Sequence, residues 1–246
     1  MSLVMVEGVG KSYGKQGDAL VTALEGVSLS IDRGEYIAIM GPSGSGKSTL
    51  LSILGAMNPP SAGRLLVDDI DVYTLSHERQ ADLRREYIGF VFQRLELIPY
   101  LTALENVMLP LAITRDRDKR GRALDALVRV GLDEKKARRL PSELSGGEQG
   151  RVAIARAIVN DPPLVLADEP IGSLDTATGQ QILDLLRELA ERGHAVVMVT
   201  HNPDSTQAVD RVIQIRDGRV SCDDGPLVCA QPSPGGCLGL NTPGGL

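Results

Sequence analysis

Short apolar segments with two different periodicities predict strands in the first part of the chain. Between residues 26 and 32, apolar residues occupy every second position, which indicates a strand with one buried face. The segment YIAIM at 36–40 is apolar throughout, as in a parallel strand that is buried on both faces. The polar residues at 15–18 predict a hairpin loop before these two strands.

The rest of the chain alternates strand-like and helix-like segments. A glycine-rich loop and a helix-compatible segment at 47–54 follow the second strand. Two further apolar runs, at 164–167 and 195–199, are joined by a segment whose apolar residues recur at helical spacing and which ends at Gly193. This succession of strands and helices predicts a mainly parallel sheet in an α/β fold.

Between about residues 100 and 160 the pattern is helical instead. The clearest segments are 122–130, which ends before Gly131, and 151–159. The mixed-charge run RDRDKRGR at 115–122 predicts a solvated loop. We therefore expect a mostly helical subdomain inserted into an α/β core, with boundaries at about 95–160 for the subdomain and at about 1–94 and 161–220 for the core.

Composition excludes several classes of protein. The chain has 246 residues, 42% of them hydrophobic, which suffices for a sizeable core and excludes disorder of the whole chain. Its 26 basic and 32 acidic residues give a net charge of -6, so it lacks the global positive charge of a nucleic-acid-binding protein. No apolar run approaches the roughly 20 residues that cross a bilayer, and the first ten residues do not resemble a signal segment. We expect a soluble protein that is not secreted.

The last residues, 221–246, are rich in glycine, proline and serine. They show no periodicity and predict a flexible tail. All three cysteines, Cys222, Cys229 and Cys237, lie in this tail. Their odd number, their wide spacing and the absence of a nearby histidine favour simple thiols over a zinc site.

The glycine-rich loop has the sequence expected of a phosphate-binding site. GPSGSGKS at 41–48 fits the pattern G-x-x-x-x-G-K-[ST] and lies between an apolar strand and a helix, which is the context that the pattern requires. Glycines let backbone amides converge on phosphate oxygens, and the helix N-terminus adds partial positive charge. Lys47 is expected to neutralise the β- and γ-phosphates, and the Ser48 hydroxyl to face Mg²⁺. The candidate nucleoside triphosphate ligands are Gly41, Pro42, Ser43, Gly44, Ser45, Gly46, Lys47, Ser48 and Thr49.

Two adjacent carboxylates follow the apolar run at 164–167. Open α/β sheets bind their ligands at the carboxyl ends of the strands, and neighbouring side chains of a strand point in different directions. Asp168 is expected to hold the Mg²⁺ shell, and Glu169 to face the γ-phosphate and activate the attacking water. An ordinary acidic turn before Pro170 is the alternative.

A second anion-binding segment is LSGGEQ at 144–149. It stands at the start of a helix that we place near Gly150, where backbone amides and the helix dipole again attract phosphate. The same segment satisfies the S-x-x-E pattern of a helix capping box, and the two roles are compatible. Its candidate ligand residues are Ser145, Gly146, Gly147 and Glu148.

Together these segments resemble the ATP-binding cassette of ABC transporters. The resemblance covers roughly residues 1–220 and rests on GPSGSGKST, Gln93, LSGGEQ, LVLADEP, SLD at 173–175 and His201, in that order. It implies a P-loop NTPase core with a mixed, mainly parallel sheet, an N-terminal antiparallel β part and an inserted helical subdomain. It also implies a homodimer in which each ATP lies between the phosphate loop of one chain and the LSGGE segment of its partner.

The resemblance implies roles for the remaining residues. Tyr13 matches the aromatic residue that stacks on adenine, and Gln93, which ends the strand-like segment IGFVFQ, matches the glutamine that contacts Mg²⁺ or water. His201 matches the switch histidine at the γ-phosphate, and Asp175 the residue that reports across the dimer. The implied catalytic residues are Lys47, Gln93, Glu169 and His201, and the implied Mg²⁺ ligands are Ser48, Gln93 and Asp168.

A finer likeness concerns LIPYLTALENVMLPL and RVAIARAIVNDPPLVLADEP, which resemble the cassettes for lipoprotein release, macrolide efflux and peptide-antibiotic resistance. This implies an integral membrane permease as partner, a location at the cytoplasmic face of the cell membrane, and export or extraction of an amphiphilic, peptide or drug-like substrate. Gly150 and Ile171 depart from the residues usual in that group, and their effect on coupling is open. The alternative is a soluble ABC-type ATPase that acts on nucleic acid or ribosomes; the single cassette and the negative charge disfavour it, so no nucleic-acid partner is expected.

Aromatic residues gather around Gln93, where four of the seven in the chain lie within fourteen residues. Phe90 and Phe92 are expected in the core. Tyr100 and its apolar neighbours either line a groove for a short helix of the membrane partner or pack between the subdomains. These neighbours are Leu95, Leu97, Ile98 and Leu101.

Overall fold

Two β-sheets organise the fold in the computed structural model, which describes residues 2–14, 20–114, 117–172 and 174–224. The first sheet is antiparallel, with the strand order β2-β1-β4-β5. Its strands are β1 (Ser2–Tyr13), β2 (Val21–Asp32), β4 (Ala62–Val67) and β5 (Ile70–Asp71). The antiparallel part expected at the N-terminus is therefore present.

The second sheet has the order β10-β9-β3-β8-β7-β6, and its neighbouring strands are parallel except for the pair β9 and β10. Its strands are β3 (Tyr36–Met40), β6 (Ile88–Val91), β7 (Leu164–Asp168), β8 (Ala195–Thr200), β9 (Arg211–Arg216) and β10 (Arg219–Asp223). This arrangement confirms the predicted mixed, mainly parallel sheet.

The central strands are buried because their residues alternate between two apolar clusters, one on each face of the sheet. In β3, Tyr36, Ala38 and Met40 belong to one cluster, whereas Ile37 and Ile39 belong to the other. Burial of one large apolar side chain contributes about 1.5–3 kcal/mol to folding. The uninterrupted apolar runs in the sequence are therefore strands with no solvent-facing side.

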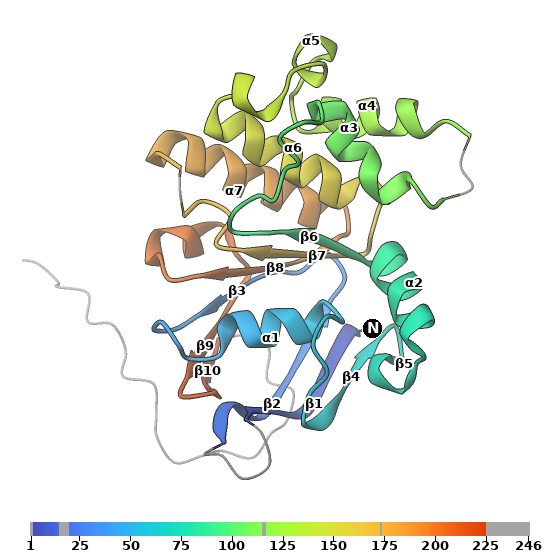
Figure 1. The fold of residues 1–246 in the computed structure, drawn as a ribbon. Coiled ribbons are helices and arrows are strands. Elements are labelled where there is room, and N and C mark those ends of the chain that lie inside the picture. Colours follow the sequence, from blue (N-terminus) through green and yellow to red (C-terminus); the bar gives the residue numbers. More distant parts are fainter. Residues whose placement is uncertain (1, 15–19, 115–116, 173, 225–246) are drawn as a thin grey trace, which may run out of the picture.

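Helices cover both faces of this sheet (Figure 1). On one face, α1 (Lys47–Leu54) packs between the large sheet and the antiparallel sheet. On the other face, α6 (Gly146–Ile158) and α7 (Thr176–Glu191) lie next to the strands. The remaining helices are α2 (His77–Tyr87), α3 (Ala103–Met108), α4 (Lys119–Arg129) and α5 (Glu134–Ala137), with 3-10 turns at Val72–Thr74, Leu109–Leu111, Pro141–Glu143 and Pro203–Ala208.

The stretch predicted to be helical at about 95–160 contains α3, α4, α5 and α6. Their buried side chains form one cluster with α7 and with one face of the sheet, so these helices share a core with the sheet rather than having one of their own. Within them, α4 begins at Lys119 because the Asp118 carboxylate accepts a hydrogen bond from Gly121 N (2.9 Å). The prediction of a loop through residue 122 was therefore wrong for the second half of the charged run.

The helix of the LSGGEQ segment also begins earlier than predicted. Ser145 is the N-cap of α6, with its hydroxyl accepting from Glu148 N and the Glu148 carboxylate accepting from Ser145 N, so the predicted capping box is present. The prediction placed the helix start near Gly150 because glycine has low helix propensity. A capping box contributes about 1 kcal/mol, and packing against α7 adds to it.

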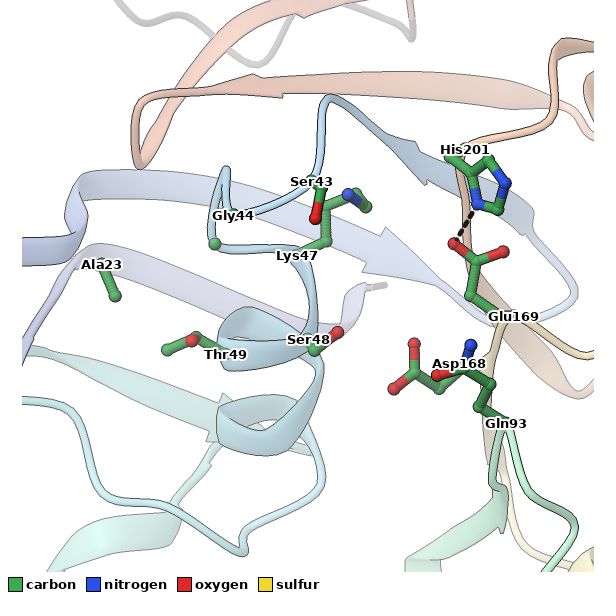
Figure 2. Close-up of a pocket in the computed structure, with 11 residues that line it drawn as sticks. Ala23, Ser43, Gly44, Lys47, Ser48, Thr49, Gln93, Asp168, Glu169 and His201 are labelled. Atoms are coloured by element: carbon green, nitrogen blue, oxygen red, sulfur yellow. Dashed lines mark hydrogen bonds and ion pairs between the residues drawn. The ribbon is translucent and has the colours of Figure 1, made fainter. Parts of the chain in front are cut away.

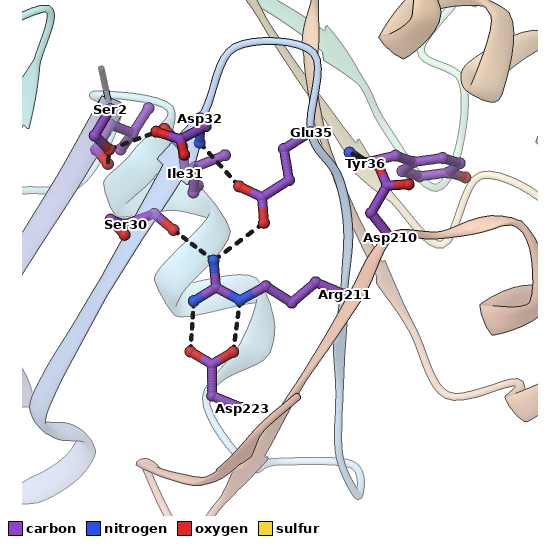
Figure 3. A network of polar contacts seen from close by, with 10 residues as sticks. Ser2, Ser30, Ile31, Asp32, Glu35, Tyr36, Asp210, Arg211 and Asp223 are labelled. Atoms are coloured by element: carbon purple, nitrogen blue, oxygen red, sulfur yellow. Dashed lines mark hydrogen bonds and ion pairs between the residues drawn. The ribbon is translucent and has the colours of Figure 1, made fainter. Parts of the chain in front are cut away.

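The C-terminal strand is anchored by a buried arginine (Figure 3). Arg211, 7% exposed, donates two hydrogen bonds to the Asp223 carboxylate (2.5 and 2.6 Å) and others to Ser30 O (2.9 Å) and to Glu35 (3.1 Å). The hydrogen bonds to Asp223 raise the pKa of Arg211, whereas its burial acts to lower it. The network ties β10 to β2 and to the turn before β3.

The prediction of a flexible tail from residue 221 was therefore wrong for its first residues, because strand β10 continues to Asp223. Cys222 lies on this strand, half-buried, with its Sγ 3.1 Å from Asp224 Oδ1. Cys229, Cys237 and the loop expected at 15–18 lie outside the described residues. Across the described ranges, the helices are too short or too polar to cross a membrane.

Candidate functional site

The loop between β3 and α1 folds tightly on itself. Lys47 is 8% exposed, and its Nζ donates to the carbonyls of Gly41 (2.9 Å) and Pro42 (2.9 Å). Gly46 has a φ of 104°, and a Cβ there would come within 2.4 Å of Ala23 O. A side chain at Gly46 is excluded both by this left-handed backbone and by the contact with β2.

The start of α1 presents unsatisfied polar groups to this loop. Its N-cap is Gly46, so no side chain accepts from the first helical amides. The Ser45 hydroxyl is buried and has no hydrogen-bond partner among the described residues. A buried ammonium beside an uncapped helix N-terminus attracts anions, so the residues present fit a polyphosphate.

A cleft of about 550 Å³ opens beside the loop (Figure 2). Its lining comes from two sides: the phosphate loop with α1, and the carboxyl ends of the strands of the large sheet. The residues are Ala23, Ser43, Gly44, Gly46, Lys47, Ser48, Thr49, Gln93, Asp168, Glu169 and His201. The structure thus brings the phosphate loop together with all four strand-end residues that the sequence singled out.

Asp168 ends β7 and lies next to the start of α1. Burial and the neighbouring Glu169 charge raise its pKa, while the Lys47 charge and a hydrogen bond with Ser48 act in the opposite direction. The carboxylate and the hydroxyl are oxygen donors of the type that Mg²⁺ binds, and Gln93 lies on the same side of the cleft as Asp168 (Figure 2). The predicted Mg²⁺ ligand set therefore lies in one place.

Glu169 is held by its backbone as well as by its side chain. Its φ of 45° is in the left-handed region, which costs a residue other than glycine about 1–3 kcal/mol. Its amide donates to Val199 O (2.9 Å), and its Oε1 lies 2.7 Å from His201 Nδ1. The carboxylate is largely buried, with 13% of the side chain exposed, whereas the His201 side chain is 72% exposed.

The LSGGEQ segment lies away from this cleft. Ser145 and Gly146 are exposed at the start of α6, and α6 and α1 pack on opposite faces of the large sheet. Lys136 contacts Glu148 at 2.8 Å, and this contact together with the Ser145 amide lowers the pKa of Glu148. The two segments predicted to bind phosphate therefore do not meet within one chain.

Tyr13 does not line the cleft either, and neither do Gly41, Pro42 and Ser45 of the phosphate loop. Tyr13 ends β1, its hydroxyl accepts from Asn58 Nδ2 (2.7 Å), and the Lys11 ammonium lies 5.2 Å from the centre of its ring. Stacking on adenine stays a prediction for this residue. Conversely, sequence reasoning missed Ala23, because only the folded contact between β2 and the phosphate loop places it beside Gly46.

A glycine loop between a buried strand and a helix, facing two carboxylates and a histidine at the ends of parallel strands, defines a P-loop nucleoside triphosphate hydrolase. The model of the ABC transporter family matches residues 24–172, more than half of the chain. The chain belongs to this family.

Relatives agree with this assignment over most of the chain. An ABC transporter ATP-binding protein of Methanocaldococcus jannaschii, MJ0796, is 45% identical over 228 residues, covering 90% of this chain and 97% of the relative. The macrolide export ATP-binding/permease protein MacB of Escherichia coli is 46% identical over 230 residues, which are 93% of this chain but 35% of MacB. This chain therefore spans about a third of that longer protein.

Solved structures of the family have the same fold. A dimeric structure of MJ0796 bound to ADP and Pi, in a post-hydrolysis state, matches with a TM-score of 0.81 and 45% identity, covering 89% of this chain and 97% of that chain. The cbiO1 protein of Clostridium perfringens, part of an ABC transporter complex, matches with a TM-score of 0.80 and 31% identity, covering 91% and 88%. The chain is an ATP-binding and ATP-hydrolysing cassette of an ABC transporter.

Proposed function

We propose that two copies of this chain assemble head to tail, bind two ATP molecules with Mg²⁺ at shared sites and drive an integral membrane permease. The observation that carries the proposal is the separation of the two phosphate-binding segments within one chain. Each is built for an anion, yet the Ser145 segment does not reach the cleft that holds Lys47. A two-fold dimer would complete both clefts at once.

Each residue of the cleft has a separate task in hydrolysis. The loop amides and Lys47 bind and neutralise the phosphates. Glu169 accepts a proton from the attacking water as the new bond to the γ-phosphorus forms and the bond to the leaving ADP oxygen breaks. His201 holds the Glu169 carboxylate in place through the 2.7 Å contact. Ser48, Gln93 and Asp168 would hold Mg²⁺, which supplies charge neutralisation at the phosphates.

The relatives support export as the task. MacB is named for macrolide export, and we infer an amphiphilic, peptide, lipoprotein or drug-like substrate for the present chain. It would then act at the cytoplasmic face of the cell membrane. A nucleic-acid or ribosome partner is not favoured, because the net charge is -6 and such partners select basic surfaces.

Mixing two inactive variants tests the shared sites. Lys47→Ala disables the phosphate loop and Ser145→Ala the opposing segment, and each variant alone should be inactive. In a one-to-one mixture, half of the dimers are mixed, and each mixed dimer has one intact site, so roughly a quarter of the wild-type hydrolysis rate should return.

The matched control mixes Lys47→Ala with Glu169→Gln. Both residues line the same cleft, so every site in a mixed dimer contains one defect and no activity should return. Equal recovery in the two mixtures, or none in the first, would contradict the head-to-tail dimer.

A further inference from the structure

The turn after Gln93 has a strained backbone. Strand β6 ends at Val91, and the chain then turns through Leu95 (φ 56°) and Glu96 (φ 47°), two consecutive left-handed residues neither of which is glycine. The turn is closed by Leu95 N donating to Phe92 O (2.9 Å) and by Glu96 N donating to Arg94 O (2.6 Å). Each left-handed residue costs about 1 kcal/mol or more, so other contacts must stabilise the turn.

Arg156 makes those contacts from helix α6. Its Nη2 donates to Leu95 O (2.5 Å) and its Nη1 to Glu96 O (2.5 Å), so one guanidinium holds the carbonyls of both strained residues. Burial lowers the pKa of Arg156. The Glu96 charge acts in the opposite direction. The hydrogen bonds that this guanidinium makes among the described residues go to the two carbonyls of the turn.

We propose that Arg156 is a positioning residue for ATP hydrolysis: its fork on two adjacent carbonyls holds the turn that presents Gln93 to the cleft, and ties it to α6. The inference rests on the proposed role of Gln93. Arg156 also links the Gln93 turn to the segment that would contact the partner's ATP, because Ser145 caps the other end of the same helix. Arg156 lies eleven positions after Ser145, or about 16 Å along the helix. A shift of α6 at its first turn would thus move the Gln93 turn.

A second arginine on α6 provides a matched control. Arg151 donates its Nη1 to Val130 O (2.7 Å) and its Nη2 to Gln181 Oε1 (3.0 Å). It has the same side chain, the same helix and the same type of carbonyl contact as Arg156, but it does not touch the turn. Lysine carries a single nitrogen and ends one bond short of the guanidinium Nη atoms, so it cannot place a separate nitrogen on each of the two carbonyls. Arg→Lys at the two positions therefore compares the turn with the rest of the helix.

The first test measures steady-state ATP hydrolysis of the full chain with Mg²⁺. Arg156→Lys should lower kcat at least tenfold with KM for ATP within about twofold, because Lys47 and the loop amides still bind the nucleotide. Arg151→Lys should leave both constants close to wild type. An unchanged kcat in folded Arg156→Lys, or an equal loss in both variants, would overturn the proposal.

The second test changes the turn and leaves Arg156 intact. Glu96 is exposed, so substitutions there do not disturb the core. Valine strongly disfavours the left-handed region, whereas asparagine tolerates it. Glu96→Val should therefore lower kcat with KM unchanged, and Glu96→Asn should not. Equal rates in these two variants would also overturn the proposal, whether or not Arg156→Lys folds.

A spectroscopic readout reports the turn directly. The chain contains no tryptophan, so Arg94→Trp at this exposed position gives a single fluorophore next to Gln93. Adding Arg156→Lys should lower its fluorescence anisotropy, and adding Arg151→Lys should not.

Gln93→Ala distinguishes failure of the proposed role of Gln93 from failure of the inference about Arg156. An unchanged kcat in Gln93→Ala refutes the role of Gln93. A large loss of kcat in Gln93→Ala together with a normal kcat in Arg156→Lys refutes only the inference about Arg156.

Discussion

At the scale of single residues, Glu169 lines the cleft with a strained backbone and a largely buried carboxylate. Glu169 combines a left-handed backbone with a carboxylate that is 13% exposed. The Val199 carbonyl fixes its amide and His201 contacts its Oε1. These contacts hold the carboxylate against His201 in the lining of the cleft (Figure 2), in the position proposed for the proton acceptor.

Replacing Glu169 by glutamine tests this role. The amide keeps the shape of the side chain and removes the proton acceptor, so kcat should fall by about 100-fold or more. ATP affinity should stay within about twofold, because the phosphate loop is untouched. Steady-state hydrolysis and equilibrium binding of ATP measure the two quantities.

The control is Glu78→Gln, an exposed residue in the first turn of α2, which should hydrolyse ATP at the wild-type rate. Near-normal hydrolysis by Glu169→Gln would exclude this carboxylate as the base.

A residue of the site could be predicted from sequence when a short local pattern marks it. The phosphate loop, Asp168 and Glu169 follow directly from short patterns next to apolar strands. Ala23 and Arg156 carry no such pattern, since their roles arise from contacts with residues more than 20 and about 60 positions away. Left-handed conformations at Leu95 and Glu96 are also invisible, because no glycine or asparagine marks them.

At the scale of elements, the crossing of α6 and α7 explains why glycines recur in the LSGGEQ helix. A Cβ at Gly147 would lie 2.2 Å from Thr178 Cγ2, whereas one at Gly150 would lie 3.4 Å from Ile182 Cδ1. Gly147 is therefore required by close packing. Gly150 has room for a methyl group.

The two glycines should respond oppositely to alanine. Gly150→Ala gains helix propensity without a clash and should raise the free energy of unfolding by about 0.5–1 kcal/mol. Gly147→Ala forces Thr178 aside and should lower it by about 1–3 kcal/mol. Urea denaturation followed by circular dichroism compares both with wild type, and shifts of the same sign would show that the helix crossing differs from this description.

These helices also show where sequence patterns fall short for whole elements. The central strands β3, β7 and β8 were predicted nearly to their ends, because burial on both faces leaves an uninterrupted apolar run. Strand β9 was not predicted. The start of α6 was placed late, since glycines suppress propensity although the Ser145 capping box was recognised. Strand β10 was missed because it pairs only at the edge of the sheet and depends on the contact of Arg211 with Asp223.

At the scale of the whole molecule, the segment after Gln93 joins the cleft to an exposed apolar surface. Leu95 and Leu97 pack against the core, as the local-packing alternative predicts. Tyr100 and Ile98 are 88% and 40% exposed, as the docking alternative predicts. The fully buried Asn106 fixes this surface, since its Nδ2 donates to Ile98 O, Leu101 O and Thr102 O and its Oδ1 accepts from Ile98 N.

An exposed tyrosine on a segment that Asn106 holds, next to the Gln93 turn, is a suitable anchor for the proposed membrane permease. Tyr100→Ser should leave ATP hydrolysis by the chain alone unchanged, because the side chain lies outside the cleft. Loss of an anchor worth about 2 kcal/mol should weaken binding of the permease roughly 30-fold. The measurement is recovery of membrane protein with the tagged chain from detergent-solubilised membranes. Val128→Ser, 64% exposed on α4, is the control and should retain it; equal retention by both variants would place the permease elsewhere on the molecule.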